Sequence, residues 1–248
     1  MINIDTDQFW VPNTPPPPLN DTICDYDIES ELKDPTRYSY IYLGSKQNDN
    51  NMKVLKFVKI TKSTIYKIKN EIETMRIVNH PNILKLEDYF KYNEYMCLVT
   101  PYMPLECLHN FIIERYSKGI PEKMASKIMY QLLNAVNYLH KHNIWHRDIK
   151  PDNILVVDND EKDPKVVLAD FGFARKFDDA DLSNEFLGTP EFTAPEIFQM
   201  EEYTNKVDIW SLGVSLFIML AAKYPTCAYS KNPRQCRWLI ERGKLNFK

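Results

Sequence analysis

The chain has 248 residues, enough for one bilobal unit or two small domains, and 44% of them are hydrophobic, as in an ordinary globular protein. A formal net charge of −3 gives no broad positive surface, so we expect neither nucleic acid nor an anionic membrane as a partner. The five cysteines include no Cys-x-x-Cys pair, which is typical of reduced thiols and predicts a cytoplasmic protein, with the nucleus not excluded.

The N-terminal residues 1–30 are acidic and polar, and they surround the four consecutive prolines Pro15 to Pro18. Because a polyproline stretch does not form a core, residues 1–30 are predicted to be a flexible arm. A plain linker is the simpler interpretation of this arm, and a docking site for a partner is the alternative.

The next segments show clear periodicities. Residues 37–44 and 52–60 alternate apolar with polar side chains on either side of a short loop, which is typical of a β-hairpin. Residues 67–78 predict an amphipathic helix, residues 95–99 an apolar strand and residues 124–141 a long helix. The positions expected to face inward are Ile68, Ile72, Met75 and Val78 in the first helix, and Ile128, Leu132, Ala135, Val136 and Leu139 in the second.

Residues 209–222 are almost continuously apolar. The run is shorter than the ~20 residues that a helix needs to cross a bilayer. It therefore predicts a helix packed by other elements on all sides rather than a membrane span.

Residues 146–153 read His-Arg-Asp-Ile-Lys-Pro-Asp-Asn. Phosphoryl transfer to a hydroxyl needs an acceptor that orients the nucleophile, a cation that neutralises charge, and oxygen ligands for Mg²⁺. Asp148 suits the first task, Lys150 the second and Asn153 the third. One short loop therefore carries all three kinds of group.

The order and spacing of this loop match the pattern H-R-D-x-x-x-x-N of protein kinase catalytic loops. Asp170-Phe171-Gly172 follows an apolar run at 166–169 that predicts a buried strand, residues 188–196 are similar to the end of an activation segment, and residues 208–213 to the start of the central helix of the large lobe. From about residue 36 to its end, the chain resembles the eukaryotic protein kinase superfamily, with Ser/Thr-type motifs similar to those of calmodulin-dependent kinases.

The resemblance implies an α+β, bilobal protein-kinase fold. A small antiparallel β-sheet lobe with one main helix, including the hinge, is expected over residues 31–103. A larger and mainly helical lobe is expected over residues 104–248. Residues 239–247 resemble the region just after the first substrate-lobe helix, so the large lobe is expected to lack its last helices.

The resemblance also implies a catalytic lysine in a strand and a glutamate partner in the small-lobe helix. Glu71 is assigned as the glutamate. The segment Val54-Leu55-Lys56-Phe57-Val58-Lys59 offers two lysines, of which Lys56 fits a V-A-I-K-like register and Lys59 is the alternative.

ATP and Mg²⁺ are the cofactors that the resemblance implies. Asn153 and Asp170 would hold the metal, and Asp148, Lys150, Asn153, Lys56 and Glu71 would form the catalytic set. The residues expected to bind the nucleotide are Lys56, Ile41, Val54, Thr100, Pro101, Met103, Leu155 and Asp170.

The glycine-rich loop of the family is not matched. Asp34, Thr36 and Ser39 stand where its glycines would lie, and glycines there let backbone amides approach phosphates closely. Two hypotheses therefore stay open: an active kinase with a poor phosphate loop, and a pseudokinase that serves nucleotide binding, scaffolding or regulation.

Substrate class and regulation follow from two further positions. Lys150, two residues after Asp148, implies a Ser/Thr hydroxyl of a protein as the acceptor, with Thr189 hydrogen-bonded near both. Glu185 occupies the site that is phosphorylated in many relatives, so its charge is predicted to pair with Arg147 without modification. Ser183 is the competing site of phosphorylation.

Overall fold

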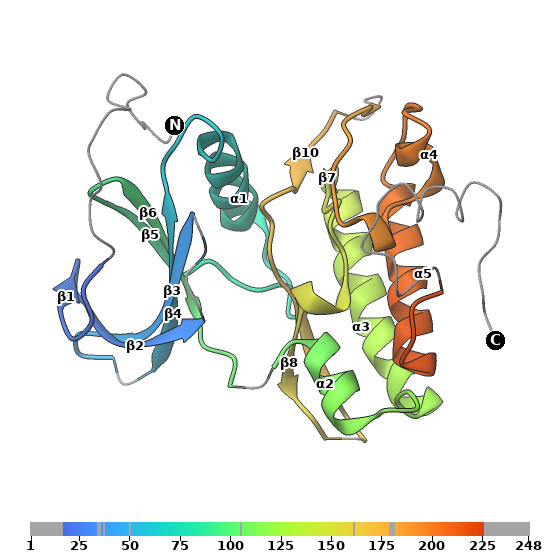
Figure 1. Cartoon of the computed structure of the whole chain (residues 1–248), viewed down its shortest axis with the longest axis horizontal. Coiled ribbons are helices and arrows are strands. Elements are labelled where there is room, and N and C mark those ends of the chain that lie inside the picture. Colours follow the sequence, from blue (N-terminus) through green and yellow to red (C-terminus); the bar gives the residue numbers. More distant parts are fainter. Residues whose placement is uncertain are drawn as a thin grey trace. The chain divides into compact units, whose positions relative to one another are not determined.

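The computed structural model describes residues 17–33, 36, 38–49, 51–104, 106–160, 162–178 and 182–225. The chain forms two compact units (Figure 1). The first unit comprises Met1–Val78 and Leu84–Tyr102, and the second comprises Asn79–Ile83 and Met103–Lys248.

The described part of the first unit contains a six-stranded antiparallel sheet and one helix. In sheet order, its strands are β1 (Thr22–Ile23), β2 (Tyr26–Lys33), β3 (Ser39–Lys46), β4 (Met52–Lys59), β6 (Tyr95–Pro101) and β5 (Asp88–Tyr92). Helix α1 (Ile65–Ile77) lies against one face of the sheet, where Ile68 and Ile72 pack with Met96 and Leu98. The four inward positions predicted for this helix are all buried.

The predicted hairpin is confirmed, since β3 pairs with β4 from Ser39 opposite Val58 to Ser45 opposite Met52. The sheet begins earlier than expected, however, because β1 and the first five residues of β2 lie in the segment that was predicted to be a flexible arm. Tyr26 and Ile28 are buried at alternate positions of an otherwise polar and acidic stretch, which hid the strand pattern. The predicted arm therefore does not include residues 22–30, and residues 1–16 lie outside the described residues.

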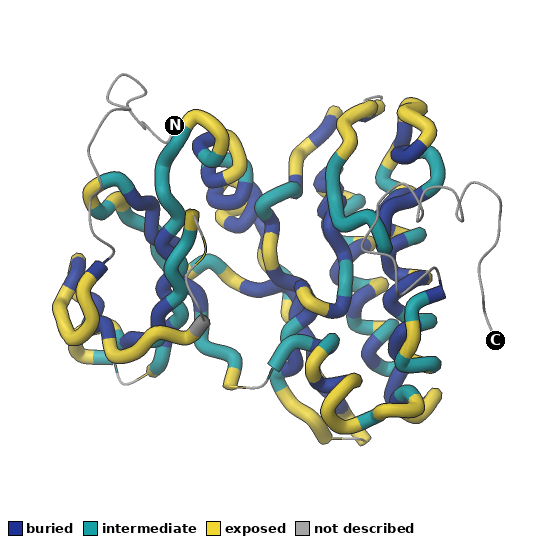
Figure 2. The backbone as a smooth tube through the Cα atoms, in the orientation of Figure 1, coloured by how far each residue is buried: buried dark blue, intermediate teal, exposed yellow. Residues whose placement is uncertain are grey.

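The second unit is mainly helical in its described part. Its helices are α2 (Leu108–Arg115), α3 (Glu122–Lys141), α4 (Pro195–Phe198) and α5 (Lys206–Ala221), with 3₁₀ turns η1 (Pro151–Asn153) and η2 (Pro190–Phe192). Two short antiparallel pairs join β7 (Ile144–Trp145) to β10 (Arg175–Lys176) and β8 (Ile154–Asp158) to β9 (Lys165–Leu168). All five inward positions predicted for α3 are buried, and burial varies along the helices as Figure 2 shows.

Helix α5 forms where the apolar run predicted a helix, but it is not covered on all sides by the described residues. Ile209 and Leu220 are 42% and 41% exposed, because α3 and η2 pack against other positions of the helix. Residues 226–248, including the predicted 239–247 segment, lie outside the described residues. Within the described part of the chain, no helix is both long and apolar enough to cross a bilayer.

Candidate active site

The backbone of the 146–153 loop is anchored to the first turn of α5. The carboxylate of Asp208 is fully buried, and it accepts hydrogen bonds from the backbone N–H of His146 at 3.0 Å and of Arg147 at 2.8 Å. Its Oδ2 atom also lies 2.8 Å from Nε2 of His140. No role was predicted for Asp208 from the sequence, although an acidic residue at the start of an apolar helix is a signal of a buried, hydrogen-bonded carboxylate.

His146 connects this loop to the segment that carries Asp170. Its Nδ1 atom accepts the backbone N–H of Asp148 at 3.3 Å, so the ring proton lies on Nε2, which donates to the carbonyl of Ala169 at 3.2 Å. The ring packs edge-on against Phe171 with centroids 4.9 Å apart. His146 is thus a buried spacer that fixes the distance between the two segments.

The side chain of Asp148 is the centre of the hydrogen-bond network in the loop. Its Oδ1 atom accepts the hydroxyl of Thr189 at 2.8 Å, and its Oδ2 atom lies 3.1 Å from Nζ of Lys150 and 3.0 Å from Nδ2 of Asn153. Nζ of Lys150 also donates to the Thr189 hydroxyl at 2.7 Å. The structure therefore brings the three predicted loop residues together with Thr189, and it leaves a preorganised carboxylate that can accept a hydrogen bond from a substrate hydroxyl.

Two side chains of the second unit, Asn153 and Asp170, carry oxygen atoms of the kind that bind a magnesium ion. The side-chain nitrogen of Asn153 donates to the backbone carbonyl of Asp148 at 2.9 Å, so the side-chain oxygen of Asn153 is the atom that could ligate a metal. Asp170 is exposed, has a left-handed backbone with φ of 62°, and accepts the N–H of Gly172 at 3.3 Å. Among the described residues, no group of three or more His, Cys, Asp or Glu side chains could hold a metal by itself. One carboxylate and one amide oxygen suit Mg²⁺, which takes its other ligands from phosphates and water.

In the first unit, Nζ of Lys56 lies 2.8 Å from Oε1 of Glu71, whose side chain is almost fully buried. Lys59 instead pairs with Glu94 at 3.3 Å. Successive side chains of a strand point to opposite faces of a sheet, so Lys56 and Lys59 in β4 cannot both face α1. The structure therefore places Lys56 against the helix glutamate.

Four of the predicted nucleotide residues of the first unit share one face of the sheet. In the register of β3, β4 and β6, Ile41 lies opposite Lys56 and Val54 lies opposite Thr100. Directly opposite residues point to the same face, and alternation places Val54 and Lys56 together, so all four side chains lie on the α1 face.

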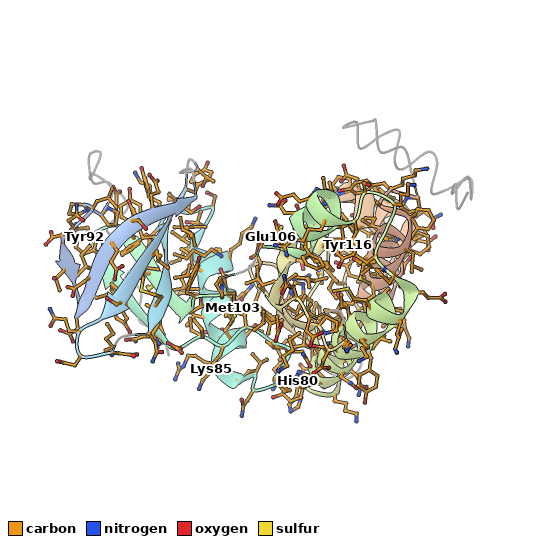
Figure 3. The ribbon with its side chains drawn as sticks, turned by 90° about the horizontal axis from the view of Figure 1, so that it is seen from below. His80, Lys85, Tyr92, Met103, Glu106 and Tyr116 are labelled. Carbon is orange, nitrogen blue, oxygen red and sulfur yellow. The ribbon has the colours of Figure 1, made fainter. Side chains whose placement is uncertain are left out.

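The remaining nucleotide residues lie at the end of this sheet and in the second unit. Pro101 ends β6, and the next residue donates its N–H to the carbonyl of Met52 at 3.2 Å. Met103, labelled with Glu106 in Figure 3, lies before α2. Leu155 lies in β8, where its backbone forms a bridge to Cys107. Each of these side chains is half-buried and so retains contact with solvent.

The turn between β2 and β3, where glycines were expected from the family, is closed by its own side chains. Oγ1 of Thr36 accepts the backbone N–H of Tyr38 at 3.3 Å and of Ser39 at 3.0 Å. The hydroxyls of Thr36 and Ser39 also lie 2.7 Å apart. Asp34 lies outside the described residues. Two amides that would face a phosphate in a glycine-rich loop are therefore already hydrogen-bonded.

The predicted contact between Glu185 and Arg147 is present. Nη1 of Arg147 lies 2.5 Å from Oε2 of Glu185, and Nη1 of Arg175 lies 3.7 Å from the same oxygen. Burial alone would raise the pKa of Glu185, but the hydrogen bond from Arg147 and the charges of both arginines outweigh it and lower that pKa. The competing site, Ser183, is buried.

Comparison with known proteins agrees with this geometry. The family model of the protein kinase domain matches residues 37–244. The chain is 32% identical over 191 residues to a probable myosin light chain kinase of Dictyostelium discoideum, covering 76% of this chain and 48% of the relative. It is 34% identical over 219 residues to the serine/threonine-protein kinase ULK3 of Xenopus laevis (87% and 45%), and 35% identical over 180 residues to calcium/calmodulin-dependent protein kinase type 1 of Macrobrachium nipponense (73% and 50%).

The chain belongs to the eukaryotic protein kinase superfamily. Its α+β architecture, with an antiparallel sheet unit and a mainly helical unit, is that of the predicted fold class. The chain spans about half the length of these three curated relatives.

Proposed function

We propose that this chain is a protein serine/threonine kinase that transfers the γ-phosphoryl group of MgATP to Ser or Thr hydroxyls of protein substrates. The observation that carries the proposal is the network around Asp148, in which Thr189, Lys150 and Asn153 hold both carboxylate oxygens. Such a network supports a carboxylate that orients an incoming hydroxyl and accepts its proton.

The roles of the other loop residues follow from their charges. Lys150 presents a cation 3.1 Å from the Asp148 carboxylate, where it would offset charge on the phosphoryl oxygens during transfer. Asn153 and Asp170 would hold Mg²⁺, which, when bound, neutralises the phosphates of ATP. In the first unit, Glu71 holds the Lys56 ammonium in a fixed position, from which it would bind phosphate oxygens.

The acceptor class rests on Thr189 and Lys150, which bond to each other and to Asp148. The name of the ULK3 relative, a serine/threonine-protein kinase, supports the same class. Protein substrates are part of the proposal, since the relatives named here are protein kinases.

A cytoplasmic location is also part of the proposal. In the described part of the chain, Cys24, Cys97 and Cys107 are all free thiols. Free thiols are typical of proteins in reducing compartments.

The test is transfer of ³²P from γ-labelled MgATP to a generic protein substrate by the purified chain and by Asp148→Asn. We expect transfer by the wild type and a loss of at least about 100-fold in the variant, the usual size of a general-base contribution. Asp163→Asn makes the same chemical change at an exposed position of the same unit, and it should retain wild-type transfer. Equal signals from the wild type and Asp148→Asn would reject catalysis by Asp148.

A second candidate function is a pseudokinase that binds nucleotide for scaffolding or regulation. The hydrogen-bonded turn at Thr36 favours the pseudokinase, because backbone amides that already donate to Thr36 bind phosphate oxygens more weakly. A thermal-shift titration with ATP, with and without Mg²⁺, distinguishes the two functions. A shift without ³²P transfer supports the pseudokinase, and no shift at millimolar ATP removes nucleotide binding from both.

A further inference from the structure

Arg147 is a buried cation next to the proposed catalytic base. Its side chain is only 3% exposed, and its backbone has a left-handed φ of 65°. Its Nε atom donates to the carbonyl of Phe173 at 2.9 Å, and its Nη1 atom donates to Glu185. Because a buried guanidinium is costly without an anion, the carboxylate of Glu185 is the group that makes this conformation of Arg147 stable.

A second arginine and two aromatic rings complete the surroundings of Glu185. The guanidinium carbons of Arg147 and Arg175 lie 5.3 Å and 5.1 Å from the centroid of the Phe177 ring. This ring is stacked on Trp145, with centroids 3.8 Å apart. The two cations are therefore held on one aromatic platform, and Glu185 is the carboxylate that bridges them.

The backbone that carries Glu185 is held independently of this charge. Ser183 and Tyr203 exchange two backbone hydrogen bonds of 3.1 Å and 2.9 Å, and the Ser183 hydroxyl donates to the Tyr203 hydroxyl at 3.1 Å. The Tyr203 hydroxyl donates in turn to the carbonyl of Glu185 at 2.9 Å. No added group is needed to order this stretch of chain.

Glu185 is connected to the Asp148 carboxylate by two short routes. The Glu185 side chain binds Arg147, and Asp148 is the residue that follows Arg147 in the chain. Through the chain, Gly188 packs against the backbone of Arg147 so closely that a Cβ atom there would lie 2.9 Å from the Arg147 carbonyl oxygen. The residue after Gly188 is Thr189, which donates to Asp148.

We propose that Glu185 is a positioning residue that holds Arg147, and through it Asp148, in the transfer geometry without any covalent modification of residues 182–189. This inference rests on the proposed kinase function and adds its regulation: transfer does not depend on an upstream kinase that phosphorylates this segment. The lowered pKa of Glu185 agrees, since the carboxylate stays ionised at neutral pH.

Ser183 does not offer an alternative route to the same charge. Ser183 is only 6% exposed, and its hydroxyl donates a hydrogen bond to the hydroxyl of Tyr203. A phosphate on this hydroxyl would break that bond and place a dianion in a buried position. Phosphorylation of Ser183 would therefore disrupt the arrangement that holds Glu185.

The experiment compares initial transfer rates of the full chain and its variants, each after phosphatase treatment verified by mass spectrometry. The variants are Glu185→Gln, which removes the charge at nearly constant shape, and Glu185→Asp, which keeps it. Glu201→Gln, at an exposed position of the same unit, is the matched control. Melting temperatures verify that every variant is folded.

We expect the phosphatase-treated wild type to keep its rate. We expect Glu185→Gln to lose kcat by about 10-fold or more at an unchanged KM for ATP, since a misplaced catalytic group costs rate rather than ground-state binding. Glu185→Asp should recover most of kcat, and Glu201→Gln should match the wild type. A role in stability alone would not produce this selective loss of kcat and its rescue by aspartate.

Three results would overturn the inference. If Glu185→Gln keeps kcat within about twofold of the wild type, Glu185 does not position the site. If phosphatase abolishes wild-type transfer and Ser183→Ala has the same effect, the segment needs modification at Ser183. If the wild type transfers no more phosphate than Asp148→Asn, the kinase function itself fails and this inference fails with it, a pattern that differs from the first two.

Discussion

Thr36 is the residue whose replacement should most directly change nucleotide binding. Its hydroxyl accepts the backbone N–H groups of Tyr38 and Ser39 and contacts the Ser39 hydroxyl. If the proposed kinase binds ATP at this turn, the phosphates must compete with Thr36 for those amides. Thr36→Ala removes the competitor and keeps a Cβ atom, whereas Thr36→Gly removes the competitor and also loosens the backbone.

The expected magnitude follows from the two hydrogen bonds. A typical bond of this kind contributes about 0.5 to 1.5 kcal/mol net, and Thr36 is exposed, so the lower end applies to each bond. Releasing both amides should therefore strengthen ATP binding by about 1 kcal/mol, or roughly fivefold in Kd. Thr36→Gly should gain less than Thr36→Ala, because glycine adds about 0.5 to 1 kcal/mol of ordering cost to the turn.

Isothermal titration calorimetry of MgATP measures this change, with adenosine as a ligand that lacks phosphates. We expect the ATP Kd to fall in Thr36→Ala and the adenosine Kd to stay constant. Ser45→Ala is the matched control. Ser45 lies at the end of β3 away from the Thr36 turn, and the variant removes a hydroxyl that bonds to Glu29 of β2. An unchanged or weaker ATP Kd in Thr36→Ala, or an equal change for adenosine, would refute the reasoning.

Three other predictions follow from the remaining contacts. Lys56→Met should abolish the ATP-dependent thermal shift, because it removes the ammonium group that Glu71 holds, whereas Lys59→Met should keep the shift. Equal thermal shifts in the two variants would contradict the assignment of Lys56 as the nucleotide-binding lysine. Asp208→Ala should lower the free energy of unfolding by about 2 to 6 kcal/mol in urea titrations, since the buried backbone N–H groups of His146 and Arg147 lose their acceptor at about 1 to 3 kcal/mol each and His140 loses its hydrogen-bond partner. A loss below about 1 kcal/mol would contradict the anchoring role. The pKa of Glu185 is lowered in the folded state, so the ionised carboxylate should stabilise the fold fully at pH values above its unfolded pKa near 4.5. This stabilisation should be lost as the pH falls through the lower folded pKa. A difference in Tm between the wild type and Glu185→Gln that persists well below that pH range would contradict the ion pair.

The 146–153 loop was predictable from the sequence because its chemistry is local. Asp148, Lys150 and Asn153 lie within six residues, and their order alone indicated a base, a cation and a metal ligand. The helices α1 and α3 were predicted by apolar residues at helical spacing, which a single amphipathic face requires. The contact of Glu185 with Arg147 was also predicted, because the resemblance to protein kinases places Glu185, counted back from Gly188, at the site that is phosphorylated in many relatives.

Strands β1 and β2 were not predicted, because their few buried residues stand among acidic and polar ones next to a proline run. The sequence favoured Lys56 by its V-A-I-K-like register and left Lys59 as the alternative. Strand alternation separates the two lysines, but only the position of α1 shows which face carries Glu71.

By itself, the sequence of this protein determined which chemical groups stand in the catalytic loop, and the regular helices around them. Only the tertiary structure decided what holds those groups: Asp208 binds the loop from 61 to 62 residues away, and Tyr203 holds the backbone of Glu185. It also showed that the hydroxyl of Thr36 occupies the amides of its own turn. The physical reason is that hydrogen bonds and ion pairs depend on distances of a few ångströms between atoms, and spacing along the chain does not fix such distances for residues brought together only by folding.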